Sequence, residues 1–223
     1  MKLKVLEKKI ISCTKCKRLI SHCKKVAQEK RRAYKDELYW GKPVPSFGDP
    51  HARILIIGLA PAAHGANRTG RMFTGDRSGD WLYRALHKQG FANQSQSSNI
   101  KDGLTLKDVF ITASAHCAPP QNKPTPKELL NCASYLQEEL KYFENAKVYL
   151  VLGQIALDAF WKLIAQTTPK LKKPKFKHGG EYALPSGKTI LMSYHPSQQN
   201  TFTGRLTEPM FDAVFTKLNR FLT

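Results

Sequence analysis

Short apolar runs and amphipathic stretches alternate along most of this 223-residue chain, and this alternation limits the folds open to it. The apolar runs have the length of buried strands, whereas the stretches between them carry apolar residues at helical spacing. Strands are expected over 53–59, 109–113, 148–153 and 189–194, and helices over 79–89, 126–143, 154–165 and 207–222. This order, with right-handed crossovers, predicts an α/β fold of three layers (α/β/α) around a central four-stranded parallel sheet. A single domain over residues 1–223 suffices at this length.

The first 50 residues precede this pattern and carry much of the positive charge. A helical body is expected over 16–38, and a turn-rich lead over 40–50 joins it to the first strand. The chain has 36 Lys and Arg residues against 17 Asp and Glu, a net charge of +19, and the excess is concentrated in residues 2–42 and 170–177. Such concentrations favour binding to a polyanion. A solvated helix face in a basic protein explains the charge equally well.

The sequence contains no signal for a membrane or for secretion. No apolar run approaches the ~20 residues that a membrane-spanning helix needs. The first 13 residues carry scattered charges and lack the apolar core of a secretory signal. We therefore expect a cytoplasmic monomer with no membrane partner.

Four of the five cysteines have the spacing of a metal site. Cys13 and Cys16 form a C-x-x-C pair, Cys117 follows the second expected strand, and Cys132 lies in the helix after it. In a cytosolic protein such a set favours a metal site over a disulfide. Four thiolates suit either tetrahedral zinc or a [4Fe-4S] cluster. The wide spacing of the second pair favours the cluster, because zinc sites more often use two tight C-x-x-C knuckles.

The fifth cysteine, Cys23, lies on the expected first helix and is interpreted as a buried thiol. Replacement of one of the four ligands by Cys23 stays open. A cluster at this place would attach the basic segment 1–50 to the sheet domain, and nothing in the sequence requires it to carry electrons.

Three polar segments follow expected strands, over 58–79, 117–126 and 195–204. The carboxyl ends of parallel strands meet at one edge of the sheet, where open α/β sheets bind their ligands. Convergence of the three segments would bring an acid, an amide, an imidazole and an aromatic ring together. The sequence therefore predicts a binding site at this edge.

At these segments the chain resembles the uracil-DNA glycosylase superfamily, and most of all its family 5 (type b, iron–sulfur-containing) enzymes. The resemblance is carried by GLAPAAHGANRTGRMFTGD at 58–76, CAPPQNKPTPKELLNC at 117–132 and HPSQQNTFTG at 195–204. The early C-x-x-C pair and YWGKPVPSFGDP at 39–50 match as well. The motifs occur in the family's order and span essentially the whole chain.

The resemblance implies a monofunctional DNA repair enzyme whose partner is DNA containing deaminated bases. Such an enzyme flips the damaged nucleotide out of the stack and hydrolyses its N-glycosidic bond, leaving an abasic site. The cleavage leaves a sugar with cationic character and a departing base with negative charge. Each charge needs a partner in the site.

The resemblance also assigns roles to individual residues. His195 donates a hydrogen bond to the departing base, and Phe73 stacks on the flipped base. Asp76 stabilises the cationic sugar and positions water, although capping of the following helix is an alternative reading of this residue. Asn122 matches a functional asparagine of the second loop, where it would otherwise be read as a turn residue.

Further residues are implied with less specific roles. Gly58, Ala60 and His64 belong to the wall of the base pocket. Arg68 and Arg71 serve either the DNA backbone or the loop's own fold. Asn200 and Arg205 lie in a tract expected to probe the minor groove beside the flipped nucleotide.

Two positions depart from the wider superfamily. Ala60 stands where many relatives carry an acid or amide that activates water, so the catalytic role is expected to move to Asp76 and Asn122. Ala113 stands where relatives read uracil with an asparagine, and loss of a polar reader weakens discrimination between bases. Uracil is therefore expected not to be the only substrate, with hypoxanthine a second one.

Two other classes of function compete with this prediction. Ala60 keeps open a non-catalytic iron–sulfur domain that only binds nucleic acid. A nucleotide-phosphate hydrolase ranks last, because the first loop lacks the Gly-Lys-Ser/Thr ending of a phosphate-binding loop.

Overall fold

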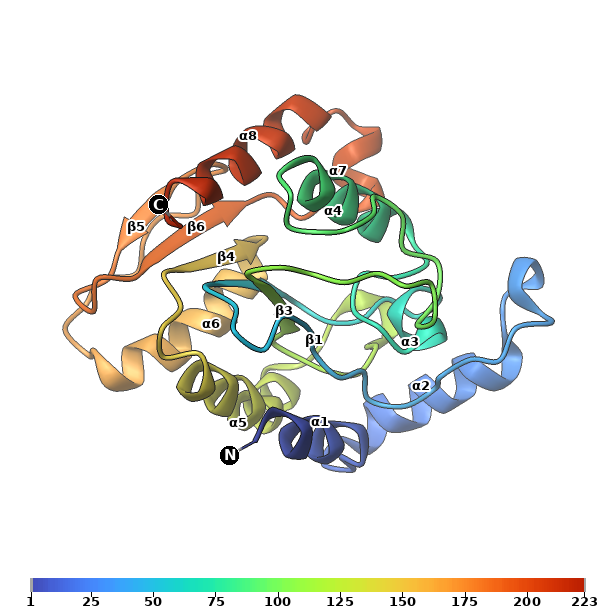
Figure 1. Ribbon diagram of the computed structural model, residues 1–223. Coiled ribbons are helices and arrows are strands. Elements are labelled where there is room, and N and C mark those ends of the chain that lie inside the picture. The colour runs from blue at the N-terminus through green and yellow to red at the C-terminus, as the bar shows by residue number, and fades with distance from the viewer. Residues whose placement is uncertain (1, 223) are drawn as a thin grey trace.

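A six-stranded sheet forms the centre of the computed structural model, which describes residues 2–222 (Figure 1). Its strand order is β1-β3-β2-β4-β6-β5. The four inner strands, all mutually parallel, are β2 (Ile54–Gly58), β3 (Val109–Ala113), β4 (Val148–Leu152) and β6 (Thr189–Ser193). They confirm the predicted parallel core.

Two edge strands correct the predicted strand number. β1 (Phe47–Gly48) and β5 (Glu181–Ala183) pair antiparallel with β3 and β6. Both are too short to show the alternation by which strands are recognised in a sequence. β1 also lies within the stretch predicted as a turn-rich lead.

Helices cover both faces of the sheet, as the three-layer prediction requires (Figure 1). Ile54 and Ile56 of β2 pack in one core with α4 (Arg77–Lys88) and α8 (Glu208–Asn219). Leu55 and Ile57 point the other way and pack with α5 (Pro126–Tyr142) and α6 (Gln154–Thr167). β2 is buried on both sides, which explains its unbroken apolar sequence.

The N-terminal segment differs from its prediction. It forms α1 (Leu3–Ile11), α2 (Lys17–Glu29) and the short 3₁₀ helix η1 (Arg32–Tyr34) in place of one helical body over 16–38. α1 was not expected, and it packs on α5 through Leu6, Ile10 and Tyr135. α2 ends at Glu29 because the next residue, Lys30, has a positive φ of 48°.

Three short helices occupy the loops at the carboxyl ends of the strands. They are α3 (Ala66–Thr69), η2 (Pro120–Asn122) and α7 (Gln198–Phe202). Among the residues described, no helix has both the length and the apolar character needed to cross a membrane.

Candidate active site

The parallel strands end at one edge of the sheet, and the loops that follow β2 and β3 are joined there. The N–H groups of Ser114 and Ala115 donate to the carbonyl oxygens of Gly58 and Leu59 at 3.0 and 2.9 Å. These bonds continue the pairing of the two strands by one further step. The loops therefore start from a rigid frame.

Phe73 and His195 meet at this edge although they come from the first and third loops. Their rings stack with centroids 5.8 Å apart and planes inclined by 29°. Gly58 lies against the phenyl ring, and a Cβ atom there would come within 3.1 Å of Phe73 Cζ. The structure thus brings together three of the predicted site residues.

His195 is held as a neutral imidazole. Burial lowers its pKa to about 4, so the ring carries no charge at neutral pH. The Asn200 amide donates through Nδ2 to the carbonyl oxygen of His195 at 2.8 Å. Asn200, predicted to contact DNA, therefore also fixes the backbone of the residue that would face a departing base.

A cavity of about 500 Å³ lies beside His195. Its walls include Leu59, Gly153, Phe176, Tyr194, Asn200 and Arg205. The guanidinium of Arg205 lies over the Tyr194 ring, 4.8 Å from its centroid. This volume suits a small flat ligand.

Sequence reasoning missed Phe176 and Tyr194. Phe176 lies in the lysine-rich stretch 170–177, which drew attention only for its charge, and Tyr194 ends the strand predicted over 189–194. The rings of Phe176 and Tyr194 are 5.8 Å apart. An aromatic residue inside a basic loop is a signal that could have indicated Phe176.

Asp76 caps α4, which was the alternative reading of this residue. Its Oδ1 accepts a hydrogen bond from the Gly79 N–H at 3.0 Å. Burial raises its pKa, although the N–H groups of Gly79 and Ser78 oppose that shift. A Cβ atom at Gly65 would lie 1.9 Å from Asp76 Oδ2. The carboxyl group is therefore closely packed in the first loop, and capping does not preclude a second role.

Arg68 is buried and holds the first loop together. Its Nε and Nη2 donate to the carbonyl oxygens of His64 and Gly75, both at 2.8 Å. Its Nη1 pairs with Glu37, and the guanidinium lies 3.8 Å from the centroid of the Tyr34 ring. With its donors engaged in this way, Arg68 supports the loop's own fold, one of the two roles that the sequence left open for it.

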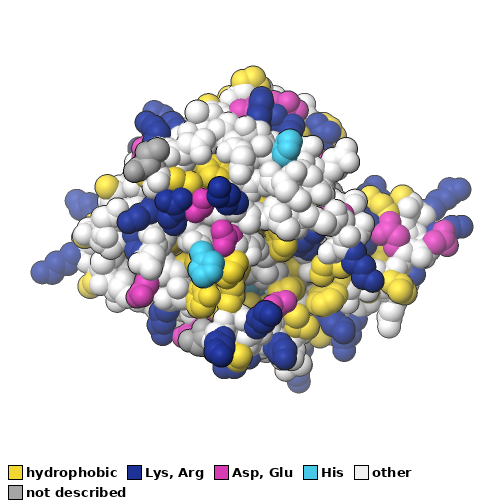
Figure 2. Space-filling view, in the orientation of Figure 1, with side chains coloured by type: hydrophobic (Ala, Val, Ile, Leu, Met, Phe, Trp, Pro, Cys, Tyr) yellow, Lys and Arg dark blue, Asp and Glu magenta, His cyan; other side chains and the backbone are white. Residues whose placement is uncertain are grey.

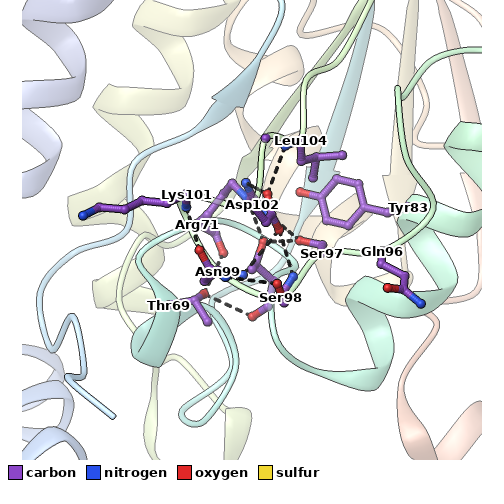
Figure 3. A network of polar contacts seen from close by, with 12 residues as sticks. Thr69, Arg71, Tyr83, Gln96, Ser97, Ser98, Asn99, Lys101, Asp102 and Leu104 are labelled. Atoms are coloured by element: carbon purple, nitrogen blue, oxygen red, sulfur yellow. Dashed lines mark hydrogen bonds and ion pairs between the residues drawn. The ribbon is translucent and has the colours of Figure 1, made fainter.

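Arg71 has the same kind of role (Figure 3). Its side chain is 3% exposed, and Nη1 and Nη2 bond to the two carboxylate oxygens of Asp102 at 2.8 and 2.6 Å. Nε donates to Thr74 Oγ1, and Nη2 also donates to Ser97 Oγ. The network joins the first loop to the segment 94–103, so Arg71 supports the loop's own fold, one of the two roles that the sequence left open for it. Asp102 was missed because this segment falls between two predicted elements, the helix over 79–89 and the strand over 109–113.

For three other predicted residues, no hydrogen bond or ring contact to the stacked pair is found in the described part of the chain. His64 Nδ1 shares a hydrogen bond with the Tyr39 hydroxyl at 3.1 Å, and Ala60 lies partly exposed near the start of the first loop. Asn122 is exposed at the tip of the second loop with a φ of 57°. Within residues 2–222, no hydrogen bond joins Asn122 to Asp76 or His195.

The first and third loops are joined by Arg77. Its Nε donates to Thr201 Oγ1 at 3.1 Å, and its guanidinium lies 4.5 Å from the centroid of the Phe202 ring. Thr201 and Phe202 belong to α7, so Arg77 ties that helix to the start of α4. Phe202 is exposed, and this gives the third loop an apolar tip.

The four cysteines predicted as ligands line one cavity between the N-terminal segment and α5. His116 lines it too, and its Nε2 atom is buried without a hydrogen-bond partner. Across the described part of the chain, no three His, Cys, Asp or Glu side chains form a group that could hold a single metal ion. What Cys13, Cys16, Cys117 and Cys132 share is the lining of this one cavity.

Cys23 is fully buried, as predicted, and is absent from the residues that line this cavity. Its thiol donates to the Ala118 carbonyl oxygen at 3.7 Å and is hydrogen-bonded to Cys117. The Cys16 sulfur accepts a hydrogen bond from Asn131 Nδ2 at 3.5 Å. N–H···S bonds of this kind are typical of the surroundings of cysteine ligands.

The fold and this edge define a three-layer α/β protein whose site pairs an aromatic ring with a neutral imidazole beside a small cavity. Residues 45–219 match the family model of the Uracil DNA glycosylase superfamily, and the chain belongs to that superfamily.

Relatives agree with the resemblance to family 5. The chain is 48% identical over 211 residues to the type-5 uracil-DNA glycosylase of Thermus thermophilus, covering 95% of this chain and 94% of that protein. It is 50% identical over 205 residues to the type-5 uracil-DNA glycosylase of Mycobacterium bovis, covering 91% and 75%. Identity to the type-4 uracil-DNA glycosylase of Pyrobaculum aerophilum is 29% over 181 residues, or 80% of each chain.

Proposed function

We propose that the protein is a DNA repair glycosylase that removes uracil from DNA by hydrolysis of the N-glycosidic bond. The observation that carries this function is the stacked pair of Phe73 and His195 at the strand edge, in a chain whose type-5 relatives match over nearly its full length. A pocket that reads a flipped base needs an aromatic face and a hydrogen-bond donor, and this pair offers both.

His195 acts on the departing base. Its imidazole is neutral, so it stabilises negative charge on a base oxygen by donating a hydrogen bond and does not protonate the base fully. The imidazole is held in place before the reaction, because its ring stacks on Phe73 and Asn200 holds the backbone carbonyl of the same residue. Preorganised donors of this kind are effective since they need not reorient as charge develops.

Asp76 acts on the sugar and the attacking water. Its Oδ1 is occupied by the cap of α4, which orients the carboxyl group, while Oδ2 faces Gly65. Asn122 completes the site from the exposed tip of the second loop when DNA is bound. Arg205 and α7 contact the DNA beside the flipped nucleotide, with Phe202 as an apolar tip suited to the minor groove.

Ala113 broadens the range of bases. Its buried methyl group ends β3, so this position has no side-chain amide to read the edge of uracil. Hypoxanthine and other deaminated bases are then rejected less strongly, because discrimination of this kind depends on a polar partner that would be left unpaired.

A [4Fe-4S] cluster is proposed for the cysteine cavity, with Cys13, Cys16, Cys117 and Cys132 as its ligands. The four thiols line one cavity, and the wide spacing of Cys117 and Cys132 favours a cluster over zinc. When bound, the cluster would supply a covalent link between the segment 1–50 and the sheet domain. The base-excision step itself needs only the residues at the strand edge.

A base-release panel tests the function. Duplex oligonucleotides with one uracil, one hypoxanthine or only normal bases are incubated with the protein and then treated with alkali. Strand cleavage is expected with uracil and hypoxanthine, and a drop of about 10²-fold or more in rate with His195→Ala or Asp76→Ala. Binding without cleavage of any duplex would favour the non-catalytic alternative, and cleavage with uracil alone would overturn the broader range.

A further inference from the structure

Residues 30–38 project from the body of the protein; we call them the basic projection. They contain η1 and follow the end of α2 (Figure 1). They lie on the side of the molecule toward which the arrowheads of β4 and β6 point, which is also the side of the candidate active site (Figure 1). The glycosylase mechanism uses none of these residues.

The charge of the basic projection is uneven. Arg31, Arg32 and Lys35 are exposed, and basic side chains gather at its outer end in Figure 2. Of its two acids, Glu37 is engaged with the buried Arg68, which leaves Asp36 as the other negative charge. The net field at the outer end is therefore positive and favours an anionic partner.

The chain around the basic projection is fixed against the first loop. The Tyr39 hydroxyl shares a hydrogen bond with His64 and accepts one from the Arg31 N–H at 3.3 Å. The Tyr34 ring packs on Arg68, which in turn bonds to the carbonyl of Gly75, next to Asp76. The projection thus has a fixed position relative to the residues that would meet a flipped nucleotide.

An apolar side chain accompanies the charges. Leu38 is 95% exposed, the highest value among the large apolar residues of the described chain. Duplex DNA presents charged phosphates and apolar sugar faces side by side, and a surface that mixes arginine with leucine suits both. An acidic protein would match the charge alone.

We infer that the basic projection is a second DNA-binding element, which contacts backbone phosphates on one side of the flipped nucleotide. This inference rests on the proposed function, because DNA is the partner. Arg31 and Arg32 supply the phosphate contacts, while α7 and Arg205 contact the DNA close to the base pocket. Phosphate contacts carry no sequence information, so the element raises affinity for all duplexes alike.

The test measures binding without catalysis. Affinity for a duplex with a non-cleavable abasic analogue is measured over a range of salt concentrations for the wild type and for Arg31→Ala/Arg32→Ala. Each lost phosphate contact lowers the slope of log affinity against log salt by about 0.9, so a decrease of about 2 is expected. Arg31→Lys/Arg32→Lys keeps the charges and should keep most of the slope.

A matched control removes two exposed lysines elsewhere. Lys107 and Lys147 are exposed and precede β3 and β4 at the opposite edge of the sheet. Lys107→Ala/Lys147→Ala changes the net charge by the same amount and should leave the slope near that of the wild type. An equal loss in both double variants would reduce the effect to net charge and overturn the inference.

DNA length locates the contact. Duplexes shortened to about two base pairs on one side or the other of the abasic analogue are compared, and the wild type should lose affinity for one shortened duplex much more than for the other. For that duplex the arginine double variant should bind as well as the wild type. Identical slopes and identical length dependence in the wild type and the arginine double variant would overturn the inference.

Uracil release by the wild type and by Arg31→Ala/Arg32→Ala is measured separately, under single-turnover conditions at saturating enzyme. A wild type that binds with the expected slope but releases no base would contradict the proposed function and leave the binding element intact. Uracil release by the wild type, together with an unchanged salt slope in the arginine double variant, would support the proposed function and contradict the binding element.

Discussion

The Phe73 ring stacks on the His195 imidazole with centroids 5.8 Å apart, and this contact joins the first and third loops. The backbone at Phe73 has a positive φ of 52°, which is unusual for a large side chain. Two buried arginines hold the residues that follow Phe73, since Arg68 donates to the Gly75 carbonyl and Arg71 to Thr74 Oγ1. The loop is therefore built around the position of one ring.

Replacement of the ring should lower activity more than stability. Phe73→Ala is expected to reduce the single-turnover rate or the affinity for uracil-containing DNA by about 1–3 kcal/mol, the value of one base–aromatic stack. Phe73→Asn should have the same effect while easing the positive φ, because asparagine tolerates that conformation. Phe73→Tyr should remain close to wild type. Unimpaired excision by the Ala and Asn variants would show that the ring does not stack on the base.

The pair of Arg71 and Asp102 gives a prediction about positioning. Burial opposes ionisation of Asp102, but the bonds from Arg71 and from backbone N–H groups outweigh it and lower the pKa of Asp102 to about 2. Asp102→Ala would leave the buried Arg71 without its counter-charge, at a cost of about 3–5 kcal/mol. Denaturant unfolding measures that loss, and Lys101→Ala, at an exposed neighbour, is the control.

The same pair predicts a pH dependence with a definite sign. A carboxyl group whose pKa is lower in the folded protein contributes stability above its unfolded pKa of about 3.9, and this contribution is lost as the pH falls toward 2. Asp102→Asn should remove this part of the acid sensitivity. In excision assays it should lower kcat more than it raises KM, because it loosens the loop that carries Phe73. An equal decrease of kcat on substitution of unrelated surface residues would contradict a positioning role for Asp102.

Glu139 predicts a pH dependence of opposite sign. This α5 residue is 1% exposed, and its carboxyl oxygens accept hydrogen bonds from Ser46 Oγ and Thr112 Oγ1, both at 2.5 Å. Burial raises its pKa to about 7. The folded protein therefore retains a proton that the unfolded chain releases near pH 4.5, and stability should fall by about 3 kcal/mol as the pH rises through this window.

Glu139→Gln keeps the shape and the hydrogen bonds and cannot ionise. Its free energy of unfolding should be nearly flat between pH 5 and pH 8, apart from the contributions of other groups. Urea titrations at several pH values compare the two proteins. A parallel decline in both would place the pH dependence elsewhere.

The sequence allowed prediction of whatever depends on local pattern. The four inner strands and the meeting of Phe73 with His195 follow from apolar runs and from the rule that parallel strands end at one edge. The sequence left two roles open for Arg68 and Arg71, because the buried contacts of each depend on a partner far along the chain, Glu37 or Asp102. A buried arginine and a DNA-binding arginine look the same in a loop sequence. Contacts, and not residue type, decide between them.

The cysteine cavity supplies the last prediction, with Cys23 as an internal control. Cys16→Ser should lose iron and sulfide from anaerobically purified protein and should expose the segment 1–50 to protease, because the proposed cluster attaches that segment to α5. Cys23→Ala should retain both iron and protection, since its thiol is buried outside the cavity that the other four line. Iron and sulfide analysis with timed proteolysis measures both. Zinc in place of iron would exclude the cluster, and loss of metal in Cys23→Ala but not in Cys16→Ser would exchange the ligand assignment of the two residues.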